Sequence, residues 1–163
     1  MVIGIIGENC SGKSTLAKRI KQELGGEVVT GKDYLRLARS ESEAAAFFRE
    51  RLKGAVSGSN MIYVISEPEQ VQLLPDGAVR ILVSADMDTI KERFKARLHG
   101  SLPAPVAGML EKKHGIFDGG SYHYHYDGVN GDPASLCEAL KRAAEEKGSF
   151  GCGDNSPKEM KDA

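Results

Sequence analysis

The sequence predicts an α/β protein built on a five-stranded parallel sheet with helices on both faces. Short apolar runs alternate with longer segments of helical periodicity, a pattern that gives strand, crossover helix and parallel strand in succession. Some runs, such as residues 61–65, are apolar without interruption, as central parallel strands are. A glycine-rich segment also joins the first apolar run to the first helical segment.

The glycine-rich segment covers residues 7–14 and reads Gly-Glu-Asn-Cys-Ser-Gly-Lys-Ser, with Thr15 next. It matches the phosphate-binding pattern G-x-x-x-x-G-K-S/T without a mismatch. The apolar run before it and the helical segment after it supply the strand and the helix that this motif requires. The sequence therefore predicts the three-layer α/β/α fold of the P-loop NTPases.

The other elements follow in order along the chain. Gly25 and Gly26 end the first helix, Pro68 begins a short one, and residues 74–77 form a turn. We expect strands over residues 2–6, 27–30, 61–65, 79–83 and 122–129. We expect helices from Thr15 onward and over residues 33–39, 41–53, 86–98, about 106–113 and 133–147, with an exposed loop over 100–108. The apolar stripe Ile90, Phe94 and Leu98 should face the interior.

Length and charge limit the possible partners. A chain of 163 residues suits one domain, which we place at residues 1–147, followed by a polar and mobile tail at 148–163. With 22 basic and 23 acidic residues, no broad basic surface for nucleic acid or membranes is expected. No apolar run is long enough to span a membrane, and no signal peptide precedes the first strand. We expect a cytoplasmic monomer or homodimer whose three cysteines are reduced thiols.

The phosphate loop predicts how a nucleotide is bound. Glycine at positions 7 and 12 lets the backbone approach the phosphates, and the amides at the helix N-terminus favour negative charge. Lys13 should bridge the β- and γ-phosphates, Ser14 should hold Mg²⁺, and Thr15 should meet the α-phosphate. The expected ATP-binding residues are Gly7, Glu8, Asn9, Cys10, Ser11, Gly12, Lys13, Ser14 and Thr15.

Motif absences narrow the class of NTPase. The chain has neither the N-K-x-D nor the D-x-x-G motif expected of a GTPase. A motor or assembly ATPase is usually larger and has a strand that ends in a clear acidic residue. Here the third strand is followed by Ser66 and Glu67, and Asp86 comes soon after the fourth strand. Either carboxylate could order the water shell of Mg²⁺, and the choice between them stays open.

Four segments resemble the P-loop nucleoside and nucleoside-monophosphate kinase family, over about nine-tenths of the chain. They are the phosphate loop, residues 30–36 (Thr-Gly-Lys-Asp-Tyr-Leu-Arg), residues 93–97 (Arg-Phe-Lys-Ala-Arg) and residues 126–130 (Tyr-Asp-Gly-Val-Asn). The second is similar to the T-G-D-x-L-R segment of adenylate-kinase-like members, with Lys32 inserted or the aspartate shifted. The resemblance implies that Arg36 contacts the acceptor phosphate and that Asp33 or Tyr34 lies near the acceptor.

The third segment is similar to the R-x-x-x-R lid signature of this family. Arg93 and Arg97 are four residues apart and share one helix face, so both could neutralise the transferring phosphoryl group. The alternative is a solvated basic stripe. The fourth segment is similar to the last strand of guanylate-kinase-like members, where the following loop passes the adenine ring.

Two other groups of residues could form a metal site or a nucleic-acid site. His123 and His125 alternate with tyrosines on the last strand and, with His114, could bind a transition metal, although an edge strand with polar packing is the simpler interpretation. The pair Lys112 and Lys113 could suggest nucleic acid, but the chain offers no stacking platform for bases. These lysines should lie on a solvated helix face unless they close over the nucleotide.

The sequence thus favours an ATP- and Mg²⁺-dependent kinase that transfers the γ-phosphoryl group to a nucleotide or nucleoside. Lys13, Arg93, Arg97 and Asp33 are the candidate catalytic residues. One alternative is a nucleotide-binding regulatory module without transfer activity. Another is a kinase of a different small metabolite, of the shikimate or gluconate type. The acceptor, and the choice between ATP and GTP as donor, stay open.

Overall fold

A computed structural model describes residues 1–146 of the chain. The chain divides into two compact units, residues 1–131 and 132–163. The second unit contains a helix over residues 133–146, close to the expected 133–147. The expected tail at 148–163 lies outside the described residues. No helix within residues 1–146 is long and apolar enough to cross a membrane.

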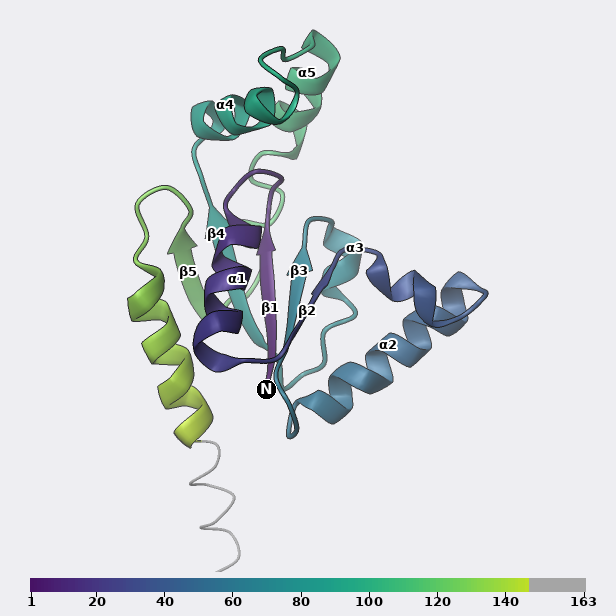
Figure 1. Cartoon of the computed structure of the whole chain (residues 1–163). Coiled ribbons are helices and arrows are strands. Elements are labelled where there is room, and N and C mark those ends of the chain that lie inside the picture. Colours follow the sequence, from purple (N-terminus) through teal and green to yellow (C-terminus); the bar gives the residue numbers. More distant parts are fainter. Residues whose placement is uncertain (147–163) are drawn as a thin grey trace, which may run out of the picture. The chain divides into compact units, whose positions relative to one another are not determined.

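The first unit is built on a five-stranded parallel sheet, as the sequence predicts. Its strands are β1 (Val2–Gly7), β2 (Glu27–Thr30), β3 (Met61–Ile65), β4 (Val79–Ser84) and β5 (Tyr124–Asp127). The strand order is β2-β3-β1-β4-β5, and every neighbouring pair is parallel. Figure 1 shows β1 between β3 and β4, so the loop after β1 emerges at the middle of the sheet's carboxyl edge.

The helices of this unit connect the strands. They are α1 (Lys13–Leu24), the 3₁₀ helix η1 (Asp33–Leu37), α2 (Glu41–Ala55), α3 (Pro68–Val71), α4 (Met87–Arg97) and α5 (Ala104–Lys113). α1 contacts β1, β2 and β3 (Figure 1). Side chains of α2 join a core cluster that includes Val2 and Ile6 of β1. The three-layer α/β/α arrangement of the P-loop NTPases is therefore confirmed.

Two expected elements differ from the structure. The α-helix expected over 33–39 is a 3₁₀ helix that ends at Leu37, because Asp33 accepts a hydrogen bond from the amide of Thr30 and Ala38 is extended ahead of α2. The segment between β2 and α2 therefore has room for only about one tight helical turn. The strand expected over 122–129 covers only Tyr124–Asp127, because the Asp127 carboxylate accepts from the amides of Val129 and Asn130 and turns the chain.

Three aromatic rings organise the core between the sheet and α2. Phe48 is 1% exposed. Its ring stacks on Tyr34, with ring centroids 5.3 Å apart, and meets the edge of Tyr63 at 4.9 Å. Both geometries are favourable for aromatic pairs. Through these contacts the core holds η1 against β3.

α4 and α5 form a smaller apolar cluster that includes a residue of the phosphate loop. Buried Ile90 and Leu110 pack there with Cys10 and Ala85, and half-buried Phe94 lies beside them. The expected stripe on α4 is confirmed for Ile90 and Phe94. Leu98 is 38% exposed because it lies just beyond the helix, at its C-cap.

Candidate active site

The phosphate loop occupies residues 7–14 between β1 and α1, where ligands of parallel α/β sheets bind. Gly12 precedes α1 with φ 111°, a conformation that favours glycine. No side chain caps α1, and its first turn holds no acidic residue. Its unpaired amides and its dipole are therefore available to an anion.

Lys13 is buried at the start of α1. Its Nζ donates hydrogen bonds to the carbonyl oxygens of Gly7 at 2.7 Å and Glu8 at 2.6 Å. Burial is the main cause that lowers the pKa of Lys13 to about 8, and the charge of Arg97 lowers it further. The carboxylates of Glu8 and Glu67 act in the opposite direction. The site thus holds an amine whose charged form would be stabilised by added negative charge.

The loop that follows β5 fixes the shape of the phosphate loop. A Cβ at Gly128 would lie 1.7 Å from the carbonyl oxygen of Ser11, so the two backbones touch. The Arg93 guanidinium donates to the carbonyl oxygens of Cys10 at 3.1 Å and Gly128 at 2.8 Å. Arg93 therefore ties α4 to both loops.

The residues of the loop suit a phosphate group and Mg²⁺. At Gly7 a Cβ would lie 2.4 Å from the carbonyl oxygen of Val83, so only glycine fits without displacing β4. Ser11 is 1% exposed, and its Oγ makes no hydrogen bond within residues 1–146. Ser14 and Thr15 are exposed, which leaves their hydroxyl groups accessible to a metal ion or a phosphate.

The two candidate carboxylates for Mg²⁺ have different surroundings. Both oxygens of Asp86 accept from Thr89, one from its amide at 3.0 Å and one from its hydroxyl at 2.7 Å. The hydrogen bond from the Thr89 hydroxyl is the main cause that lowers the pKa of Asp86, and the one from the Thr89 amide lowers it further. The two hydrogen bonds also cap α4. Glu67 is close enough to Lys13 for its charge to raise the pKa of that lysine. Asp86 lines a cavity of about 430 Å³ together with Glu8 of the phosphate loop, so the choice between the two carboxylates stays open.

The predicted acceptor residues lie beside β2 and η1. Asp33, Tyr34 and Arg36 line a cavity of about 270 Å³ with residues of β2 and α2. Tyr34 is buried and stacked on Phe48, so its ring belongs to the core. Arg36 is exposed. Glu27 and Arg51 also line the cavity and form an ion pair at 2.9 Å. The roles of Asp33 and Arg36 toward an acceptor stay predictions.

Each of the three histidines has a separate contact. His123 accepts a hydrogen bond at Nδ1 from the amide of Arg80, and the ring of His125 meets the edge of Tyr122. His114 contacts Glu8 instead. No group of three or more metal-ligating side chains occurs in the described part of the chain. His123 and His125 are both exposed, and their roles stay open.

Sequence reasoning missed the contacts between the phosphate loop and the end of α5. Glu8 pairs with His114 Nδ1 at 3.0 Å and accepts from the amide of Gly115 at 3.2 Å. Lys113 forms an ion pair with Glu67 at 3.0 Å, and 36% of its side chain stays exposed. Neighbouring Lys112 is exposed, as expected. The sequence did not show which of the two adjacent lysines would pair with Glu67.

Comparison with known proteins supports the fold assignment. No protein-family model and no curated protein matches the sequence. Among solved structures, a gluconokinase from Sinorhizobium meliloti 1021 aligns with a TM-score of 0.58 and 17% identity over 89% of this chain and 94% of that one. A shikimate kinase from Bacteroides thetaiotaomicron aligns with a TM-score of 0.56 and 15% identity over 89% and 98%. This chain has the fold of the small P-loop kinases.

A third solved structure shares this P-loop kinase fold. It is the YorR protein from Bacillus subtilis in complex with phosphorylated GDP, with a TM-score of 0.59 and 19% identity over 91% of this chain and 98% of that one. At these low sequence identities, the structural alignments establish the architecture alone. The chemistry of a P-loop kinase depends on the residues that the fold carries.

Proposed function

We propose that this protein is a small-molecule kinase that transfers the γ-phosphoryl group of ATP to a nucleotide or nucleoside. The observation that carries the proposal is the buried Lys13 at the uncapped N-terminus of α1. A buried amine with a lowered pKa gains a partner when the phosphates of a nucleotide enter the loop. The P-loop kinase fold supports the same activity.

Catalysis by such a site consists of positioning and charge stabilisation. Lys13 and the amides at the start of α1 would hold the triphosphate. Arg97, whose charge already acts on Lys13, would face the negative charge that develops as the bond to the γ-phosphorus breaks. Ser14, with Glu67 or Asp86 acting through water, would hold Mg²⁺, which supplies further neutralisation of the phosphate oxygens. Arg93 keeps its predicted catalytic role here, although its guanidinium also ties the loops together.

The acceptor is proposed to bind beside β2 and η1. Asp33 and Arg36 line the cavity there, and an arginine suits an acceptor phosphate. A kinase of another small metabolite is the second candidate, because the gluconokinase and the shikimate kinase share the fold of this chain. The structure of YorR with phosphorylated GDP is in keeping with a nucleotide acceptor.

Phosphoryl transfer from Mg-ATP to a pooled panel of nucleosides, nucleoside monophosphates and small hydroxy acids tests the proposal. Product masses identify the acceptor, and a repeat with Mg-GTP tests donor choice. Lys13→Ala should reduce product formation by orders of magnitude, since the variant loses the buried amine between the loop and the phosphates. Transfer at an unchanged rate in Lys13→Ala would disprove the proposed site.

A regulatory nucleotide-binding module is the third candidate, and Arg97 separates it from a kinase. Arg97→Ala in a kinase should lower kcat far more than nucleotide affinity, because the charge it faces appears only in the transition state. In a sensor the same substitution would change affinity alone. Lys95→Ala, on the same exposed part of α4, is the matched control.

A further inference from the structure

The end of α5 is fixed to the phosphate loop by one side chain. Glu8 uses both carboxylate oxygens, one toward His114 Nδ1 and one toward the amide of Gly115. The Glu8 side chain is 13% exposed and His114 is 43% exposed. The carboxylate itself is therefore largely shielded from water, and shielding strengthens its hydrogen bonds. The backbone next to Lys113 is therefore held in a defined place relative to residues 7–14.

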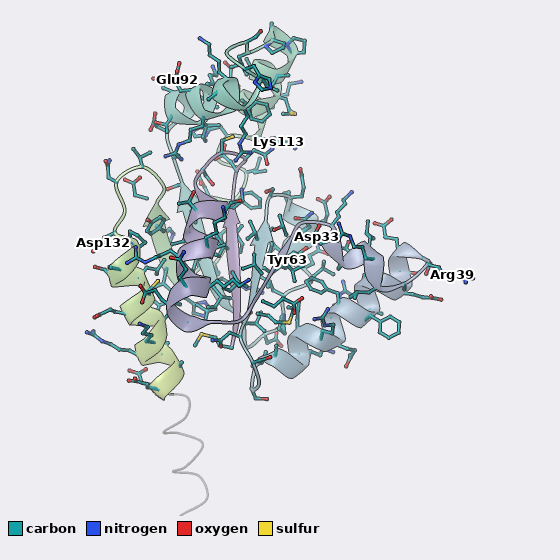
Figure 2. All side chains as sticks on the ribbon, viewed as in Figure 1. Asp33, Arg39, Tyr63, Glu92, Lys113 and Asp132 are labelled. Carbon is teal, nitrogen blue, oxygen red and sulfur yellow. The ribbon has the colours of Figure 1, made fainter. Side chains whose placement is uncertain are left out.

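This anchoring brings a cation to the site. Lys113 is the last residue of α5, and its Nζ lies 3.0 Å from Oε1 of Glu67, which follows β3. Figure 2 places Lys113 at the junction between the α4 and α5 pair and the sheet. Lys113 comes two residues before Gly115, whose amide donates to Glu8 in the phosphate loop, so its ammonium lies close to the loop that carries Lys13. The charge of Glu67, its partner, also acts on Lys13.

We propose that Lys113 is a further catalytic residue, which binds the terminal phosphoryl group of the nucleotide. The inference rests on the proposed function, since it requires a triphosphate in the loop. A terminal phosphate carries more charge than the single carboxylate of Glu67 and accepts strong hydrogen bonds from ammonium groups. When the triphosphate binds, the ion pair between Lys113 and Glu67 breaks and Lys113 binds the terminal phosphate instead. Glu67 is then available to the water shell of Mg²⁺.

The test compares nucleotides that differ in the terminal phosphate. Binding of Mg-ADP and of the β,γ-imido analogue of Mg-ATP is measured by calorimetry for the wild type, Lys113→Ala and Lys112→Ala. Lys113→Ala should weaken the triphosphate analogue about tenfold or more, the scale of one lost charged contact, and change ADP less than about twofold. Lys112→Ala should change neither, and Lys113→Arg should restore most of the loss.

Equal weakening of ADP and the analogue in Lys113→Ala, or no weakening of either, would overturn the proposal. Unchanged ADP affinity also shows that the variant is folded. A wild type that binds the analogue but phosphorylates no acceptor would contradict the proposed function. The comparison of ADP with the analogue would still decide the role of Lys113 in binding. A wild type that binds neither nucleotide would overturn both.

Glu8 acts in this proposal as a positioning residue, and a double-mutant cycle tests it. Glu8→Ala should reduce the preference for the triphosphate over ADP, because the end of α5 loses its anchor. In the Glu8→Ala, Lys113→Ala double variant the preference should fall no further than in Lys113→Ala alone. Additive losses would show that Glu8 does not act through Lys113.

Discussion

The guanidinium of Arg93 donates a hydrogen bond to the carbonyl oxygen of Gly128 at 2.8 Å, which joins α4 to the loop after β5. A second hydrogen bond, 3.1 Å long, reaches the carbonyl oxygen of Cys10. Cys10 has φ 64°, an uncommon conformation for a residue with a side chain. The contact with Arg93 helps to hold the phosphate loop in this conformation.

Arg93→Ala should therefore lower both stability and nucleotide affinity. The substitution leaves two carbonyl groups without their charged donor, and we expect a loss of about 1.5 kcal/mol in the free energy of unfolding, because the group is only partly buried. Thermal melting and calorimetry measure the two effects. Arg97→Ala is the control, since Arg97 is exposed on the same helix and its loss should leave the melting temperature unchanged. Equal melting temperatures for both variants would contradict the prediction.

Gly128→Ala should reduce nucleotide binding strongly while the core remains folded. The added Cβ would lie 1.7 Å from the carbonyl oxygen of Ser11 and 3.1 Å from that of Ser84, so one of the two loops must move. Gly119→Ala is the matched control, because nothing lies within 4 Å of its Cβ position. Circular dichroism and nucleotide titration distinguish loss of the site from loss of the fold. Normal binding by Gly128→Ala would mean that the two loops separate without cost.

Nucleotide affinity should fall as the pH rises above about 8. Lys13 has a pKa of about 8 in the protein because burial disfavours its charged form. Phosphate oxygens favour the charged form, so binding raises the pKa and takes up a proton at pH values above about 8. The dissociation constant should rise by up to about tenfold per pH unit until the pKa of the bound state is reached.

Calorimetry at pH 9 in two buffers with different ionisation enthalpies measures this proton uptake directly. Lys13→Arg provides the control, because a guanidinium stays protonated throughout this range and should take up no proton. A wild type that binds nucleotide with the same apparent enthalpy in both buffers would show that Lys13 is already charged in the free protein.

Phe48→Ala should destabilise the protein by about 3 to 5 kcal/mol, the usual result of removing a buried aromatic ring. Its ring contacts both Tyr34 and Tyr63, so the cavity cannot close without disturbing η1. Phe47→Ala is a matched control one residue away, because Phe47 is 58% exposed and its loss should change stability by about 0.5 kcal/mol or less. Urea denaturation followed by circular dichroism gives both values.

The sequence predicted the sheet and the phosphate loop because both depend on local patterns. Apolar runs identify strands, and the glycine and lysine spacing of residues 7–14 identifies the loop without any tertiary information. The short 3₁₀ helix at Asp33–Leu37 was less accessible, because its type depends on a hydrogen bond between Asp33 and the end of β2.

Contacts between distant segments could not be predicted from one sequence. The helical spacing of Arg93 and Arg97 shows that they share a face, but only the folded chain shows that Arg93 reaches the carbonyl oxygens of Cys10 and Gly128. The pair formed by Glu67 and Lys113 joins residues 46 positions apart. Neither residue belongs to a motif, so periodicity and spacing carry no information about their meeting.

The central place of β1 in the sheet has a consequence for synthesis on the ribosome. β1 emerges first, yet its two neighbours are β3 and β4, which begin at Met61 and Val79. β1 therefore stays unpaired until β3 is complete at Ile65, and it gains its second neighbour only when β4 is complete at Ser84, after more than half of the described chain has been made. Since Gly128 also touches Ser11, the nucleotide site can be completed only after the last strand arrives. A ligand for this site would act late in folding, on a nearly finished protein, and could not guide its early steps.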